Sequence, residues 1–113
     1  MKVVERISVG ELHTMSERMS EPLVKGVVDI ARRVLVIDAG LHVDEELYLI
    51  EQGSNQADLW GINLWPESFG TDDFVEFDSM INIRPVQGNR SRGVEDPVVR
   101  QSIVEIVAEK IHE

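Results

Sequence analysis

The sequence predicts an α+β domain with a largely antiparallel sheet, in the order β-α-β-β-α-β-β-α. Residues 59–65 and 74–84 both alternate apolar and polar side chains, as expected of two paired strands joined by a loop. Residues 23–38 are rich in valine and isoleucine, which favours strands. Residues 97–110 carry apolar side chains at helical spacing. These patterns together predict a sheet packed against helices.

Length and composition restrict the classes of protein to consider. The chain has 113 residues, which suits a single domain spanning residues 1–113, and its hydrophobic content of 42% is that of a folded protein. It has no cysteine, so disulfides and thiolate metal sites are excluded. Glu5 and Arg6 interrupt the N-terminal apolar run, and no run approaches the ~20 residues of a membrane span. We therefore expect a cytoplasmic protein that does not bind membranes.

The N-terminal third predicts a strand followed by a helix. Residues 2–7 alternate weakly and include β-branched side chains, which favours a first strand. Ser8 and Glu11 have the spacing of a capping box, in which each side chain bonds the other's backbone amide. The spacing predicts a short helix over residues 9–19, ended before Pro22.

The middle of the chain predicts two strands and a second helix. In residues 23–38 we expect two strands joined at 31–33, because Gly26 weakens a helix. A helix remains the alternative, since Leu23, Val27, Ala31 and Val34 also form one helical stripe. Acids at its start and Gly53 at its end favour a helix over residues 43–51, although the apolar run within it is also compatible with a strand.

The last part of the chain predicts a hairpin and a C-terminal helix. In the hairpin, Val75, Phe77, Ile81 and Ile83 are expected to form the buried face of the second strand. In the first strand, Trp60, Ile62 and Leu64 share one face. Asp96 is a good N-cap and Pro97 suits the first helical position. The apolar stripe of the final helix consists of Val99, Ile103, Ile106 and Val107, and continues to Lys110.

Charge is unevenly distributed along the chain. The net charge is −10, so we expect no non-specific binding to nucleic acid. Residues 79–94 nevertheless contain three arginines and no acid. Guanidinium groups, flexible glycine-rich backbone and a following helix start are the parts of an anion site. The predicted ligand-binding residues are Arg84, Gly88, Asn89, Arg90, Ser91 and Arg92. Alternatively, these arginines pair with the protein's own acids.

Two further constellations are candidates for chemistry. His42, Asp44 and Glu46 alternate, and with Asp38 or Asp29 they have the residue types of a divalent metal site for hydrolysis. Acids that open a helix are, however, usually solvated. If Asn63 pairs near Glu76, a polar surface would form from Asn63, Glu76, Asp78, Asn82 and Arg84. Two carboxylates beside an arginine could perform acid-base work, although one sheet face is commonly just solvated.

Residues 40–66 and 74–97 resemble an uncharacterised family of short prokaryotic single-domain proteins of about 110 residues, classed as a domain of unknown function. The similarity extends over nearly the whole chain and is densest at "GLHVDEELYLIEQGSNQADLWGINLWP" and "FVEFDSMINIRPVQGNRSRGVEDP". The resemblance implies a single domain. It implies no activity and no catalytic residues, because the family has none assigned.

Three functional hypotheses follow from the sequence. The first is a small binding module whose loop 84–93 binds an anionic, phosphate-bearing ligand. The second is a structural or interaction domain that forms a homo-oligomer through its acidic and basic patches. The third is a metal-assisted hydrolase that uses His42, Asp44 and Glu46. No cofactor other than a divalent metal in that third case is expected.

Overall fold

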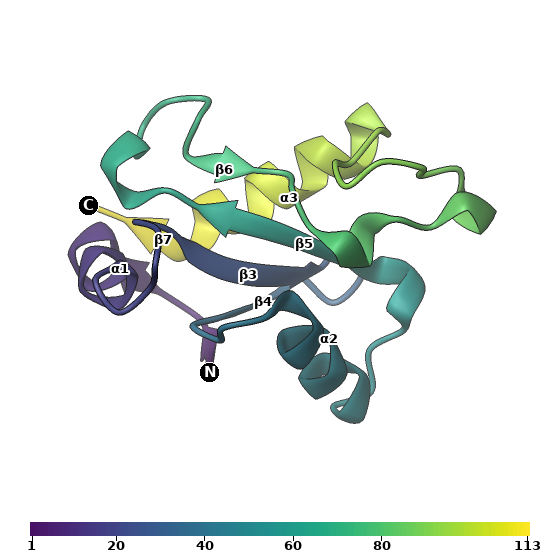
Figure 1. Ribbon diagram of the computed structural model, residues 1–113, viewed down its shortest axis with the longest axis horizontal. Coiled ribbons are helices and arrows are strands. Elements are labelled where there is room, and N and C mark those ends of the chain that lie inside the picture. Colours follow the sequence, from purple (N-terminus) through teal and green to yellow (C-terminus); the bar gives the residue numbers. More distant parts are fainter.

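The computed structural model describes residues 1–113 and has a five-stranded antiparallel sheet with helices on both of its faces (Figure 1). The strand order is β1-β4-β3-β5-β6. The strands are β1 (Lys2–Val4), β3 (Val24–Asp29), β4 (Val34–Ile37), β5 (Leu59–Leu64) and β6 (Val75–Glu76). The predicted α+β class and the antiparallel sheet are therefore confirmed. None of the helices has the length and apolar character needed to span a membrane.

One face of the sheet carries the larger hydrophobic core. Helices α1 (Val9–Ser16) and α3 (Pro97–Lys110) cover it, and Leu12, Ile103 and Ile106 are completely buried there. As predicted, Pro97 opens α3 and Asp96 caps it, with Asp96 Oδ1 accepting from the Val98 amide at 2.8 Å. A short parallel pair, β2 (Ile7–Ser8) with β7 (Ile111–His112), joins the two ends of the chain.

The other face of the sheet carries α2 (His42–Glu51). Its buried apolar cluster is much smaller and consists of Val27, Val36, Leu49 and Leu59. Gly53 adopts a φ of 101° just after the helix, as expected of a glycine at a helix end. The remaining helical segments are single 3₁₀ turns at Gln56–Asp58, Pro66–Ser68, Met80–Asn82 and Pro85–Gln87.

The expected hairpin in residues 23–38 is present, and Asp29 explains how it turns without glycine. Asp29 Oδ1 accepts hydrogen bonds from the amides of Ala31 and Arg32, both at 2.9 Å. This side chain therefore supplies the acceptor that holds the turn. Arg33 completes the turn in the left-handed region, with a φ of 57°.

Two boundaries near the N-terminus differ from the prediction. The strand expected over residues 2–7 is split, because β1 ends at Val4 and β2 begins at Ile7 on a different sheet. The helix expected over residues 9–19 ends at Ser16. The Ser16 hydroxyl donates to the His13 carbonyl at 2.7 Å and competes with the backbone amides for this acceptor. The residues after Ser16 therefore continue only as tighter turns.

The strand predicted over residues 74–84 was wrong beyond its start. β6 has only two residues, and the chain then enters 3₁₀ turns. The cause is Asn82, whose buried amide accepts from the Gly61 N–H at 2.8 Å and donates to the Gly61 carbonyl at 2.9 Å. The Asn82 side chain thus forms the hydrogen bonds to Gly61 that the backbone of a neighbouring strand would otherwise form. The prediction that the apolar residues of this segment form one buried face was also wrong, because Ile81 packs on the α2 side and Ile83 is exposed.

Candidate functional site

The three loop arginines do not converge on one open site. Arg84 is held in a cage of carbonyls, donating to Ile81 O at 3.1 Å, to Gln56 O at 2.7 Å and also to Leu59 O. Its guanidinium lies 4.3 Å from the centre of the Trp60 ring. Arg84 therefore ties the turn after β6 to the start of β5, and its donors are largely used by the fold itself.

The rest of the loop is also largely occupied by internal partners. Arg92 Nε donates to Asp78 Oδ1 at 2.6 Å. The amides of Arg90 and Ser91 donate to Glu95 Oε2 at 2.6 and 3.0 Å, so a carboxylate of the protein already fills this amide cradle. The amides of Ser91 and Arg90 also lower the pKa of Glu95. Of the three loop arginines, only Arg90 has a guanidinium without an internal partner.

Gly88 and Asn89 shape the turn. Gly88 has a φ of 81°, which glycine adopts without strain. The Asn89 amide is buried and donates to the carbonyls of Asn82 at 2.7 Å and Gly93 at 2.8 Å. These interactions give the glycine-rich sequence of the loop a structural explanation.

The three predicted metal ligands point in different directions. His42 Nε2 donates to the Ile62 carbonyl at 2.7 Å, Asp44 is exposed, and Glu46 lies inside near Arg84. No group of three or more histidine and acidic side chains is close enough to hold a metal ion. The helical geometry of residues 42–51 is the cause, because alternating residues share a face only in a strand.

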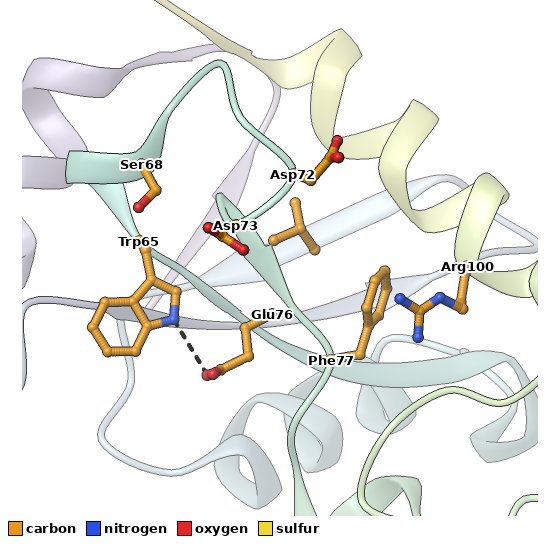
Figure 2. A pocket seen from close by; sticks show the side chains of 8 residues that line it. Trp65, Ser68, Asp72, Asp73, Glu76, Phe77 and Arg100 are labelled. Carbon is orange, nitrogen blue, oxygen red and sulfur yellow. Dashed lines mark hydrogen bonds between the residues drawn. The ribbon is translucent and has the colours of Figure 1, made fainter.

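The structure pairs Asn63 with Glu76, which was the condition for the polar surface considered from the sequence. The two residues are register partners between β5 and β6, and Asn63 Nδ2 donates to Glu76 Oε1 at 2.9 Å. Trp65 Nε1 donates to the same oxygen at 3.2 Å, and Figure 2 shows the indole and the carboxylate facing each other. Asp78 stays beside them, since its carbonyl accepts from Asn63 Nδ2 at 3.3 Å. Asn82 and Arg84, in contrast, turn away to Gly61 and Trp60.

This polar group forms part of a cleft of about 390 Å³ on the α2 side of the sheet, which we call the central cleft. Lys25 of β3, His42 at the start of α2 and Arg92 of the loop also line it. The apolar part of its lining consists of Leu23, Leu41, Val43, Trp65, Met80 and Ile81. The volume lies within the range of ~300–1,000 Å³ typical of small-molecule sites.

Charge in the central cleft is arranged across three neighbouring strands. Lys25, Asn63 and Glu76 are consecutive register partners on β3, β5 and β6. Two strand spacings separate Lys25 from Glu76, which is about 10 Å. Neither Lys25 nor Glu76 forms an ion pair, whereas Asp78 and Arg92 neutralise each other. Glu21 also lines the cleft and forms no ion pair. The cleft therefore holds one unpaired cation, Lys25, and two unpaired anions, of which Glu76 lies at a fixed separation from Lys25 across β5.

Two neutral groups complete the site. Burial lowers the pKa of His42 below its ordinary value of 6.5, although its hydrogen bond to Ile62 acts in the other direction. The imidazole is therefore uncharged at neutral pH. Asn63 is 5% exposed, and its Oδ1 is buried without a hydrogen-bond partner. The Asn63 side chain also lies close enough to His42 to act against burial and raise the pKa of the imidazole.

A second hollow, with a volume of about 420 Å³, shares Trp65 and Glu76 with the central cleft. Figure 2 shows Asp72, Asp73 and Ser68 around it and Arg100 beside the Phe77 ring. The Arg100 guanidinium is 4.3 Å from the centre of that ring. Trp65 and Glu76, which are hydrogen-bonded to each other, thus line both hollows.

Comparison with known proteins identifies the family. A family model described as a protein of unknown function, DUF5674, matches residues 1–110. The chain belongs to this family. No curated protein and no solved structure matches the chain. Membership in this uncharacterised single-domain family confirms the resemblance seen in the sequence and assigns no activity.

Sequence reasoning missed Lys25 and the role of Trp65 in the central cleft. One signal was present, because Lys25 is the only charged side chain between Leu23 and Val28 in an otherwise apolar strand. Cationic side chains are rarely placed at such positions without a partner. Trp65 gave no signal of its own, since its partner Glu76 is 11 residues away in the chain.

Proposed function

We propose that this protein is a small binding module whose ligand is a zwitterion of the amino acid or short peptide class, held in the central cleft. The observation that carries the proposal is the placement of two unpaired, opposite charges, Lys25 and Glu76, across one strand. A ligand amine would lie against Glu76 and a ligand carboxylate against Lys25. The binding class agrees with the sequence-based hypothesis, but the site differs from the arginine loop.

The orientation of Glu76 favours recognition of a cationic donor. Both hydrogen bonds from the protein end on Oε1, from Asn63 and from Trp65. Oε2 receives none and is left to accept from a ligand. Side chains fixed in this way lose little entropy when a ligand arrives, which favours affinity.

The lining explains why the ligand would be small and only partly polar. Leu23, Leu41 and Met80 offer apolar surface for a short side chain. The Asp78–Arg92 pair at the edge is neutral as a unit and adds hydrogen-bonding groups without net charge. A bare phosphate would meet one cation, Lys25, together with the uncompensated charge of Glu76.

Thermal unfolding and titration calorimetry against free amino acids and dipeptides would test the proposal. Each compound is compared with its N-acetylated form, which lacks the cation, and its amidated form, which lacks the anion. A zwitterion at 100 times its dissociation constant stabilises the folded state by about 2.7 kcal/mol, which raises Tm by several degrees. Loss of the shift with both capped forms is the expected result.

Matched variants locate the site. Glu76→Gln and Lys25→Met should each weaken binding of the zwitterion about ten-fold or more, since each removes one charge-assisted contact. Glu67→Gln and Lys110→Met change the same residue types outside the cleft and should leave binding unaltered. A zwitterion that binds both cleft variants with wild-type affinity, or a panel without any capping-sensitive binder, would overturn the proposal.

A further inference from the structure

Helix α2 is inverted relative to an ordinary surface helix, because it turns carboxylates inward and apolar side chains outward. Glu45 is 0% exposed and Glu46 is 6% exposed, both facing the sheet with Leu49. The outer side carries Val43, Leu47 and Ile50, which are 42%, 51% and 38% exposed. Positions i, i+4 and i+7 form one stripe on a helix. We call these three residues the α2 apolar face.

The inversion is costly for an isolated domain. Two carboxyl side chains lose their hydration, and Glu45 Oε1 and Glu46 Oε2 are buried without hydrogen-bond partners. Three branched apolar side chains remain in water, where their burial would otherwise be favourable. Leu41, 57% exposed, and Met80, 65% exposed, extend the apolar surface beside Val43. Clustered exposed apolar residues of this kind mark interaction sites.

Nothing in the chain itself covers this face. Figure 1 shows α2 on the opposite side of the sheet from α3, with its outer side turned away from the other elements. Its principal tertiary contacts are with β3 and β4, on its inner side. Any occupant of this face would therefore have to be another molecule.

The charges beside the stripe indicate what that molecule is. Asp44 and Glu51 lie seven residues apart along one edge of the stripe, both exposed and neither in an ion pair. Residues 42–51 contain no lysine or arginine. Two copies joined through this face would place these acids near each other, which is unfavourable. A partner with basic side chains beside an apolar stripe would neutralise them.

We propose that the α2 apolar face docks an amphipathic helix of a different protein, whose apolar stripe is flanked by lysine or arginine. Such a helix would pack its stripe against Val43, Leu47 and Ile50 and place its cations beside Asp44 and Glu51. This surface adjoins the central cleft, because Val43 lines both, but it does not include Lys25 or Glu76.

The test is selection from a displayed library of helical peptides against the intact protein. The library fixes apolar residues at i, i+3, i+4 and i+7 and randomises the flanking positions among lysine, arginine, glutamate and serine. Peptides that bind wild type are expected to be enriched in lysine and arginine. Leu47→Asp should weaken the enriched peptides at least ten-fold, and Asp44→Lys combined with Glu51→Lys should weaken them similarly.

Val104→Asp is the matched control, because Val104 lies on α3 and is 41% exposed. It should leave peptide binding unchanged, and thermal unfolding of every variant verifies that it folds. Three outcomes would overturn the proposal: no enrichment, enrichment of acidic flanks, or equal binding to the Leu47→Asp variant. A concentration-dependent dimer in sedimentation that Leu47→Asp abolishes would also overturn it, assigning the face to a second copy.

Discussion

Asn63 donates to Glu76 Oε1 at 2.9 Å, while its own Oδ1 is buried without a partner. The Asn63 side-chain amide thus donates to the Glu76 carboxylate and to the Asp78 carbonyl, while its oxygen accepts no hydrogen bond from the protein. This pair connects β5 to the short strand β6. It is therefore both a structural link and the floor of the central cleft.

Removing the Asn63 amide should destabilise the protein and loosen Glu76. Asn63→Ala deletes two hydrogen bonds at a residue that is 5% exposed, which is expected to lower the free energy of unfolding by about 1–3 kcal/mol. Urea unfolding followed by tryptophan fluorescence measures the change. Asn55→Ala is the control, because Asn55 is exposed and caps nothing with its side chain. Equal stability of the two variants would contradict the assigned role.

The buried Glu45 should make stability depend on pH. Burial raises its pKa from 4.5 to about 9, although the Ala39 amide bonded to Oε2 at 3.2 Å acts in the other direction. The unfolded chain loses this proton above pH 4.5 and the folded protein keeps it until about pH 9. The contribution of Glu45 to stability is therefore greatest below pH 4.5 and is lost as pH rises toward about 9, by up to about 1.4 kcal/mol for each pH unit.

Glu45→Gln should reduce that slope, since glutamine stays neutral in both states, and leave the part that comes from Glu46, whose pKa burial also raises. Urea unfolding of wild type and variant at pH 5, 6, 7 and 8 gives the two slopes. The lowered pKa of His42 has the opposite effect, decreasing stability below pH 6.5, but it is common to both proteins and cancels in the comparison. Glu51→Gln, on the exposed side of α2, should keep the wild-type slope. Parallel slopes for Glu45→Gln and wild type would exclude an ionisable role for this residue.

The sequence predicted correctly those elements that are determined by interactions between residues close together in the chain. The cap at Asp96, the proline at 97 and the periodic stripe of α3 act within one helix, and all three are present. The alternation of residues 59–65 likewise identified β5, with Trp60, Ile62 and Leu64 together on the larger core. The pairing of Asn63 with Glu76 followed from joining two such patterns.

The features that sequence reasoning missed depend on contacts between distant residues. Alternation predicted a strand through Asn82, but the Asn82 side chain takes the place of a backbone ladder opposite Gly61, 21 residues away. The positive charge of the loop suggested an anion site. The loop instead uses Glu95 to fill its amides and the carbonyls around Trp60 to hold Arg84. Periodicity and composition do not report such pairings.

Gly61 should tolerate no side chain, because the segment after β6 packs directly on it. A Cβ at Gly61 would lie 2.6 Å from both Cβ and Oγ of Ser79. Gly61→Ala should therefore displace Ser79 and the Asn82 amide, lowering the free energy of unfolding by about 1–3 kcal/mol. Chemical unfolding measures this, with Gly40→Ala as the control, since a Cβ at Gly40 meets nothing within 4 Å. A stable Gly61→Ala would mean that Ser79 does not sit on β5.

Arg84 and Arg90 should behave in opposite ways, and this contrast tests the arginine loop. Arg84→Lys keeps the charge but loses the planar fork that reaches the carbonyls of Gln56 and Leu59 and the stacking on Trp60. We expect it to lower the free energy of unfolding by about 2 kcal/mol, as hydrogen bonds from charged groups are worth about 1.5–3 kcal/mol each. Arg90→Ala, at an exposed side chain, should leave stability unchanged within about 0.5 kcal/mol.

The same pair of variants decides whether the loop binds anions. An anion site at residues 84–93 now depends on the guanidinium of Arg90, because Arg84 and Arg92 have internal partners. Calorimetric titration with inorganic phosphate and with a nucleoside diphosphate, at low and moderate salt, measures the affinity. Salt-sensitive binding that Arg90→Ala weakens several-fold would establish a loop site beside the central cleft. If wild type and Arg90→Ala give the same result with both anions, the arginines serve the fold, since the carbonyl cage and the Asp78 pair already use them.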